Sequence, residues 1–196
     1  GDWPRVAGQA EKHPAVKAAA PFVQAQGMLS FNQNVRGAMV RGVLPDLEDK
    51  VADFRPHMKS GELDALQPDS FTIILGSELA RALGVFVGDR VTLISPQGVV
   101  TPAAVVPRLK TFTVAGLFEV GMYEYDSGLA LIHLADAQRL YRMDDRVSGV
   151  RLKLDDLFLA PRVARTLAST LDTDAFVSDW TRSHANFFRA VQIEKN

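Results

Sequence analysis

The sequence predicts an α+β fold built on antiparallel or mixed sheets. Short β-branched segments alternate with short helical segments along all 196 residues, and no segment is long enough to suggest the repeated crossovers of a parallel sheet. With 47% hydrophobic residues, the chain can bury a core either as one domain or as two small ones.

The first third of the chain is expected to hold two strands, over residues 18–26 and 35–43. Both segments are rich in small and β-branched residues. Pro45 ends this unit, because proline lacks the backbone N–H that a strand needs. Residues 46–70 show no clear periodicity and are expected to be loosely ordered, with a helical hint only at residues 60–63.

The middle of the chain gives clearer signals. The apolar run at residues 71–75 predicts a short strand, and residues 77–83 predict a helix with Ser77 as its cap. Gly84 supplies the left-handed conformation that closes such a helix. Two further strands are expected at residues 90–95 and 110–118.

The last third continues the alternation of strands and helices. Strands are expected at residues 128–133, 147–154 and 175–177, and helices at residues 134–141, 162–171 and from about residue 181 to the end. The terminal helix shows no stop signal before the chain ends, which indicates a piece cut from a longer protein. No run of 18 apolar residues occurs, so a membrane anchor would lie outside this sequence.

The composition excludes several classes of protein. Twenty-two Lys and Arg against 23 Asp and Glu give a net charge of −1, which argues against a nucleic-acid-binding protein. The absence of cysteine excludes disulfide scaffolds, thiolate zinc sites and cysteine nucleophiles. No two of the four histidines are spaced i, i+4, so the sequence predicts no metal site and no cofactor.

The motifs that could support catalysis are incomplete. Gly37 and Gly42 have phosphate-loop spacing, but the Lys and Ser/Thr of that loop are missing, and Ser77 lacks the second glycine of a nucleophile elbow. The carboxylates between Glu119 and Asp126 could line a groove, although no His lies near them in the sequence. The sequence therefore predicts a binding module and not an enzyme. A hydrolase or small-molecule binder would need a deep pocket that joins these carboxylates to a histidine.

The connection between the strands at 90–95 and 110–118 is unusual. It is longer than an ordinary hairpin loop, and residues 95–107 carry no charge. Its apolar residues are Val99, Val100, Val105 and Val106, and its prolines are Pro96, Pro102 and Pro107. The prolines are expected to discourage sheet extension and self-pairing. The valines either fold back into the parent core or stay exposed for another protein to cover.

Several segments, taken in order, resemble one known family. They are residues 74–80, 83–85, 87–91, 114–118, 134–138, 147–150 and 186–196, with Trp180 before the last. The set is similar to the periplasmic domain of lipoprotein-releasing ABC transporter permeases, the LolC/LolE family. This resemblance implies a MacB-like domain at the inner membrane that faces the periplasm. A β-rich, sabre-like subdomain over residues 46–145 would be inserted into a membrane-proximal, porter-like α/β subdomain made of residues 1–45 and 146–196.

The resemblance also implies a function. The domain would dock a soluble LolA-like lipoprotein carrier through a hook hairpin at residues 95–108, and it would transmit motion driven by a LolD-like ATPase subunit to lipoprotein release. A second permease copy or a paralogue would complete the assembly. The implied partner-binding residues are Pro96, Val99, Val100, Thr101, Pro102, Val105, Val106, Pro107, Arg108 and Lys110.

Two further features follow from the same resemblance. Lys110 keeps a positive charge of the polar pad that lies beside the LolC hook, whereas Thr92 and Leu109 replace an Arg and a Gln. Phe187, Phe188 and Val191 are expected to flank the path of the lipoprotein close to the bilayer. The alternative within the same architecture is a MacB-type efflux permease, whose partner is a membrane-fusion protein.

Overall fold

The computed structural model describes residues 1–100, 102–170, 175–179 and 190–195, and it confirms the α+β class. The chain divides into two compact units. Unit 1 contains Gly1–Val23, Val43–Asp53 and Asp145–Asn196, and unit 2 contains Gln24–Gly42 and Phe54–Asp144. Strand β1 (Val16–Phe31) contributes its first part to unit 1 and its second part to unit 2.

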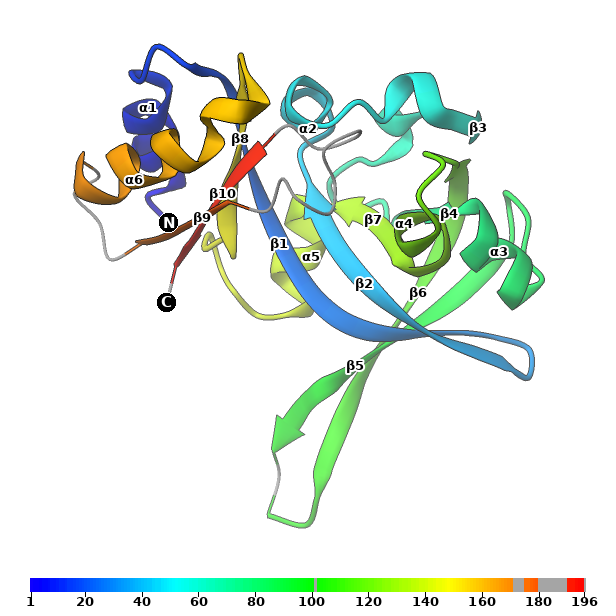
Figure 1. The fold of residues 1–196 in the computed structure, drawn as a ribbon. Helices are drawn as coiled ribbons and strands as arrows, with labels where there is room; N and C mark the ends of the chain where they lie inside the picture. The colour runs from blue at the N-terminus through cyan, green and yellow to red at the C-terminus, as the bar shows by residue number, and fades with distance from the viewer. Residues whose placement is uncertain (101, 171–174, 180–189, 196) are drawn as a thin grey trace. The chain divides into compact units, whose positions relative to one another are not determined.

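Unit 1 is an antiparallel sheet with helices. Its strands are ordered β1-β8-β10-β9 (Figure 1). Besides β1, its elements are α1 (Trp3–Glu11), α2 (Pro45–Val51), β8 (Gly149–Leu154), the 3-10 turn η3 (Leu157–Leu159), α6 (Ala160–Thr170), β9 (Ala175–Asp179) and β10 (Ala190–Lys195). Alternate residues of β8 belong to the core shared with α1 and α6, and Arg151 between them reaches α2 instead.

The prediction of a terminal helix is wrong for residues 190–195, the part of it that the structure describes. Residues 190–195 form strand β10, in which Val191 is opposite Leu152 and Ile193 is opposite Val150. The prediction of a helix came from the spacing of these two residues together with Phe187 and Phe188, which lie outside the described residues. Val191 and Ile193 are two apart, which suits a strand, and β8 and β9 supply hydrogen-bonding partners on both sides.

Unit 2 is a closed β-barrel. The strand order β2-β7-β4-β6-β5-β1 closes on itself because β1 also pairs with β2. Its strands are the second part of β1, β2 (Asn34–Val43), β4 (Thr72–Gly76), β5 (Arg90–Val100), β6 (Val105–Phe118) and β7 (Leu129–His133), with β3 (Met58–Ser60) paired to β6. Its helical elements are the 3-10 turns η1 (Arg55–His57) and η2 (Leu63–Ala65) and the helices α3 (Ser77–Leu83), α4 (Tyr123–Gly128) and α5 (Leu134–Leu140).

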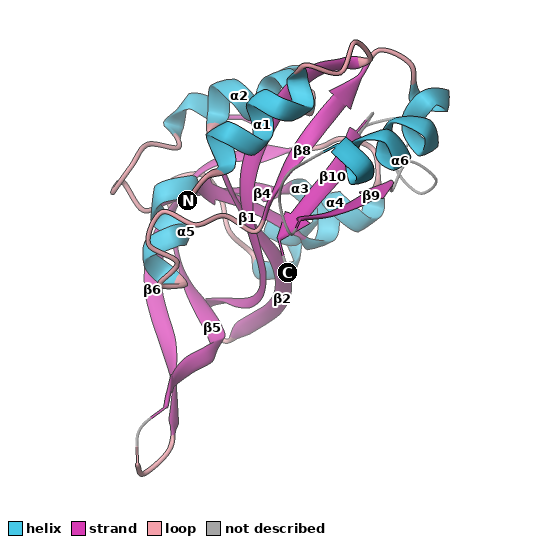
Figure 2. Cartoon of the chain, turned by 90° about the vertical axis from the view of Figure 1, so that its left-hand side faces the viewer, coloured by secondary structure: helices cyan, strands magenta, loops and turns pink. Residues whose placement is uncertain are grey.

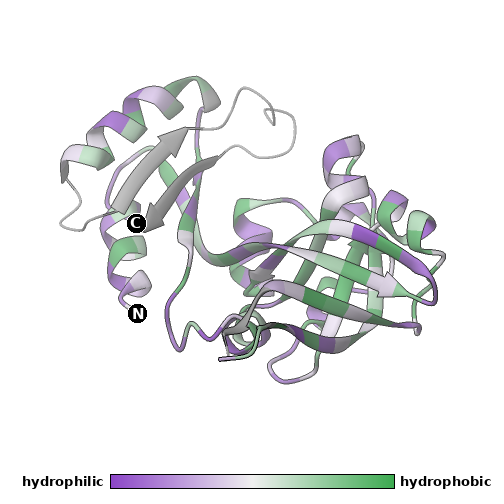
Figure 3. Cartoon of the chain, turned by 90° about the horizontal axis from the view of Figure 1, so that it is seen from below, coloured by the Kyte–Doolittle hydropathy of each residue, from purple (hydrophilic) through white to green (hydrophobic). Residues whose placement is uncertain are grey.

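The barrel interior follows the two-residue period of its strands. On β6, Phe112, Val114 and Phe118 are fully buried, whereas the intervening Thr111 and Thr113 are exposed. Figure 3 shows hydrophobic segments along these strands. Phe54 packs edge-on against Phe118 with ring centroids 5.4 Å apart.

The boundaries of the two units differ from the predicted ones at two places. Residues 24–42 lie in unit 2, because the long β1–β2 hairpin supplies two walls of the barrel. Residues 43–53 lie in unit 1 and include helix α2, in a segment that we expected to be loosely ordered. Pro45 in its first turn and the acidic Asp46 and Glu48 are the signals that favour this helix.

Most other predicted elements agree with the structure. The strand β4 leads into α3, and Gly84 ends that helix at φ +78°. Ser77 was expected to cap α3, but Gly76 takes that position, and the Ser77 hydroxyl donates to Glu119 at 3.2 Å. No helix in the described part of the chain is long and apolar enough to cross a bilayer.

Candidate functional site

The uncharged connection between β5 and β6 is a projecting hairpin. Both strands continue beyond the barrel as a two-stranded ribbon, visible at the bottom of Figure 1 and again in Figure 2. The ladder pairs Ser95 with Arg108, and Val99 and Val100 with Val106 and Val105. The expectation that the prolines prevent sheet extension was therefore wrong.

The prolines lie where the ladder is interrupted. Between the Ser95–Arg108 pair and the Val99–Val106 pair, the register shifts, so that residues 96–98 of β5 face only Pro107 of β6. Such a bulge leaves residues without ladder hydrogen bonds, and proline has no N–H to contribute to them. The bulge thus accommodates Pro96 and Pro107 inside a continuous ribbon.

The tip of the ribbon exposes apolar side chains. Pro96, Pro102 and Pro107 are exposed, and Val106 has 49% of its surface accessible. Thr101 and the side chains of Val99, Val100 and Val105 lie outside the described residues. Where it is described, the ribbon extends away from its barrel and does not fold onto it (Figures 1 and 2).

Arg108 joins the base of the hairpin to α5. Its Nη1 donates a hydrogen bond of 2.9 Å to the carbonyl oxygen of Leu140, the last residue of that helix. The last carbonyls of a helix have no partner within the helix, so a cation is favourable there. The resemblance implied that Arg108 binds a partner, and in the structure its half-buried guanidinium has this contact inside unit 2.

The three residues of the expected polar pad do not form one cluster. The Lys110 ammonium lies 4.0 Å from the centroid of the Phe71 ring, a cation–π contact. Thr92 is opposite Thr111, and Leu109 is opposite Ile94. Because neighbouring residues of a strand point to opposite faces, Lys110 lies on the other face of the sheet from Thr92 and Leu109.

Sequence reasoning missed Met28 beside the hairpin, and it treated Leu109 only as a lost position of the polar pad. Met28 on β1 is opposite Ile94 on β5, which is itself opposite Leu109 on β6. Met28 and Leu109 are exposed although both are large and apolar. The signal for Leu109 was present, since it stands uncharged between Arg108 and Lys110, but only the strand pairing brings Met28 to its side.

The carboxylates considered for acid–base chemistry have structural partners. The buried Asp126 carboxylate accepts hydrogen bonds from the N–H groups of Val120 and Gly121, at 2.8 and 3.0 Å. Glu119 pairs with Lys59 at 3.1 Å, and the Lys59 ammonium holds the pKa of Glu119 below its usual value. Among the described residues, no group of three or more His, Asp or Glu side chains is arranged to bind a metal ion.

His133 is a helix cap. Its Nδ1 accepts a hydrogen bond of 3.0 Å from the N–H of Ala135, which satisfies one free donor at the start of α5. Burial lowers the pKa of His133 from its usual 6.5, and the charges of Asp136 and Asp69 oppose that shift only in part. The neutral imidazole is therefore the form that folding favours.

This cap predicts a dependence of stability on pH. Because unfolding raises the pKa of His133 back toward 6.5, the unfolded chain binds the proton more readily. The contribution of neutral His133 to stability is complete above about pH 6.5. It is lost as the pH falls from that value through the lower pKa of His133 in the folded state. We expect the free energy of unfolding to decrease as the pH falls from about 7 toward the lower pKa of His133 in the folded state.

Urea denaturation at several pH values measures this effect. In His133→Asn, the side-chain amide keeps a hydrogen-bond acceptor but does not titrate, so the decrease over this interval should be smaller than in the wild type. Replacing the half-buried His57, which lies on η1 and does not cap α5, should leave the decrease in place. Equal slopes for the wild type and His133→Asn would contradict the assignment.

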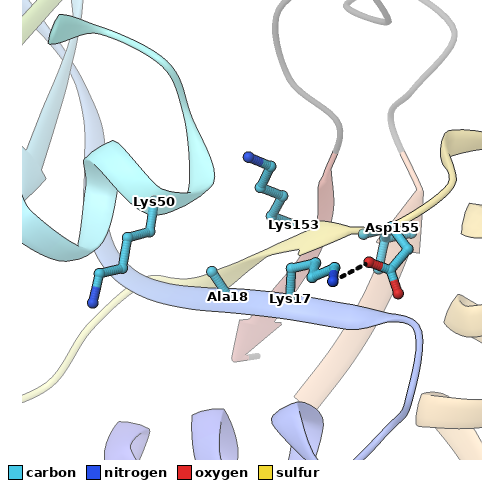
Figure 4. A pocket seen from close by; sticks show the side chains of 6 residues that line it. Lys17, Ala18, Lys50, Lys153 and Asp155 are labelled. Atoms are coloured by element: carbon cyan, nitrogen blue, oxygen red, sulfur yellow. Dashed lines mark ion pairs between the residues drawn. The ribbon is translucent and has the colours of Figure 1, made fainter.

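A lysine-lined pocket of about 400 Å³ lies in unit 1 (Figure 4). It is bordered by Lys17, Ala18, Lys50, Lys153, Leu154 and Asp155. Lys17 pairs with Asp155 at 3.0 Å, and Figure 4 shows the Lys50 and Lys153 side chains extending in different directions. Since the ammonium groups do not converge, this pocket is a weaker candidate than the hairpin.

The residues expected along the lipoprotein path are only partly described. Phe187 and Phe188 lie outside the described residues, and Val191 is the second residue of β10. The projecting hairpin therefore carries most of the candidate site.

The comparisons with known proteins agree with the sequence resemblance. The chain is 47% identical over 195 residues to LolC of Neisseria meningitidis serogroup B, which covers 99% of this chain and 47% of that protein. It is 44% identical to LolC of Xylella fastidiosa 9a5c, over 99% of this chain and 46% of that protein. Both relatives are named lipoprotein-releasing system transmembrane proteins, and this chain spans about half of their length.

Two solved structures share the fold. The extracellular domain of the transporter YknZ from Gram-positive bacteria matches with a TM-score of 0.52 at 11% identity, over 84% of this chain and 81% of that one. The periplasmic region of MacB from Actinobacillus actinomycetemcomitans matches with a TM-score of 0.53 at 15% identity, over 85% and 72%. The model of the MacB-like periplasmic core domain family matches residues 2–170, so the chain belongs to that family and is, within it, similar to LolC.

Proposed function

We propose that this chain is the periplasmic domain of the permease subunit of a lipoprotein-releasing ABC transporter in the inner membrane. It docks a soluble LolA-like lipoprotein carrier through the tip of the β5–β6 hairpin. The observation that carries this proposal is the ribbon itself, which projects from the barrel without a charge between Ser95 and Pro107. The similarity to LolC proteins over 99% of the chain supports the transporter assignment.

The role is mechanical and not catalytic. A LolD-like ATPase subunit, reached through membrane segments, would drive the motion, and unit 1 would be the membrane-proximal part that transmits it to the hairpin. A second permease copy or a paralogue, together with the lipoproteins themselves, completes the assembly, and Phe187, Phe188 and Val191 would flank the lipoprotein path. The structural partners of the Asp126 and Glu119 carboxylates and the capping role of His133 support a non-catalytic function.

The apolar tip suits a transient contact. Burying four valines contributes roughly 1.5–3 kcal/mol each, or about 6–12 kcal/mol together. Association itself costs about 4–15 kcal/mol, which consumes much of that gain. The carrier can therefore bind and leave within one transport cycle.

Val106→Asp tests the hairpin tip. A carboxylate that is buried without a partner in the contact is unfavourable, so we expect carrier affinity to fall at least about tenfold. The binding of the purified carrier from the same bacterium to the immobilised chain measures the effect. Val35→Asp is the matched control, because Val35 lies on β2 of the same unit and has a similar exposed fraction, 41% against 49%.

Equal carrier retention by the wild type and Val106→Asp would reject the hairpin as the docking element. The MacB-type alternative makes a different prediction for the same preparation. If a membrane-fusion protein co-purifies with the full permease and the carrier does not bind, the chain is the periplasmic domain of an efflux permease.

A further inference from the structure

The two faces of the ribbon differ in charge. On β6, Val106, Arg108 and Lys110 share the face that continues into the barrel interior, where Phe112 follows them. Pro107, Leu109 and Thr111 share the outer face. Both basic residues of the hairpin base are thus on the inner face, and the outer face is uncharged.

The inner face at the base already has contacts within unit 2. Arg108 donates to the carbonyl of Leu140, and Lys110 lies over the Phe71 ring. Because these contacts hold both cations against unit 2, the outer face is the surface at the base that a partner bound to the tip would cover first.

The outer face continues as an apolar row on the barrel wall. Met28, Ile94 and Leu109 are directly opposite one another on β1, β5 and β6. Met28 is 41% exposed and Leu109 is 61% exposed, whereas the inward-pointing Leu29 and Leu93 beside them are fully buried. Met28, Ile94 and Leu109 define what we name the apolar row.

The surroundings of the apolar row are also uncharged. The next row toward the barrel consists of Ser30, Thr92 and Thr111, and the following one begins with Arg90 opposite Thr113. Toward the tip lie the exposed Pro96 and Pro107. Among the described residues, this face therefore carries no charge from Pro96 and Pro107 to the row of Ser30, Thr92 and Thr111.

We propose that the carrier docked at the hairpin tip also covers the apolar row, so that the contact at the base is apolar and not ionic. This inference rests on the proposed function. Val105 and Leu109 are four positions apart on β6, a span of about 13 Å along the strand. A standard interface buries about 800 Å² on each partner, so one carrier can reach both. The carrier surface that fits is aliphatic and uncharged.

Leu109→Gln and Lys110→Gln form a matched pair that tests this inference. The two residues are neighbours on β6, both exposed, and point to opposite faces. We expect Leu109→Gln to weaken carrier binding about tenfold, because the affinity contributed by an apolar side chain is lost. Lys110→Gln should stay within about twofold of the wild type. Affinity for the purified carrier should not fall when NaCl is raised from about 0.05 to 0.5 M, since salt screens only ionic contacts.

The outcomes separate this inference from the proposed function. If Val106→Asp weakens binding and Leu109→Gln does not, the hairpin docks the carrier and the apolar row takes no part, which overturns the inference. If neither variant weakens binding, both fail. If Lys110→Gln weakens binding and salt abolishes it, the contact is ionic and the inference is wrong.

A second measurement tests the competing occupant, another copy of this chain. Sedimentation velocity of the wild type should show no dimer that Leu109→Gln dissociates. Such a dimer, together with unchanged carrier affinity, would assign the apolar row to self-association and overturn the inference. Met28→Ser repeats the carrier measurement on another strand and should weaken binding in the same direction as Leu109→Gln.

Discussion

Removing either partner of the buried Arg151–Glu48 ion pair is expected to lower the free energy of unfolding by about 3–5 kcal/mol. Arg151 is on β8 and Glu48 is on α2, and their side chains are 1% and 0% exposed. A single replacement leaves one charge buried without its partner, which is far costlier than losing a surface pair. Equilibrium urea denaturation of Glu48→Leu and Arg151→Met measures this loss.

The double variant makes the prediction sharper. In Glu48→Leu combined with Arg151→Met, no charge remains, so stability should recover above that of either single variant. Lys17→Ala is the control, because its ion pair with Asp155 is largely exposed and should contribute less than about 1 kcal/mol. A double variant that loses the sum of the two single effects would show that the pair is not coupled in this way.

Phe118→Ala is expected to have the second large effect, a loss of about 3–5 kcal/mol. Phe118 is fully buried on β6, opposite Gly76 of β4 and Met58 of β3, and its ring packs edge-on against Phe54. Truncation to alanine removes that contact and leaves a cavity that the closed barrel can fill only in part.

Phe86→Ala serves as its control in the same unit. Phe86 lies in the turn between α3 and β5 and is mostly exposed, so its removal should change stability by less than about 0.5 kcal/mol. Both variants are compared with the wild type by urea denaturation. Similar losses for the two variants would contradict the assignment of Phe118 to the barrel core.

The structure explains how a proline-rich segment forms a projecting strand pair. Pro96 and Pro107 lie together at the register shift, so their missing N–H groups cost few ladder bonds. The prediction that prolines stop the strands treated each residue alone. Only the pairing between β5 and β6 shows that the two prolines share one interruption, beyond which the ladder resumes at Val99 and Val106.

Local chemistry in the sequence was enough to predict several elements of this fold. An apolar run followed by a helical segment and Gly84 predicted β4 and α3, because helix and strand periods and left-handed glycine depend on neighbouring residues. The absence of charge from Ser95 to Pro107 likewise distinguished the hairpin from the other connections between strands, because net charge along a segment depends on its residues alone.

Only the tertiary structure decided the features that depend on pairing between distant residues. The barrel closes because β1 pairs with both β5 and β2, and β10 is a strand because β8 and β9 lie on both sides of it. The contact of Arg108 with Leu140 and the row of Met28, Ile94 and Leu109 arise in the same way. A sequence specifies which side chains alternate along a strand, but strand register determines which of them meet across a sheet.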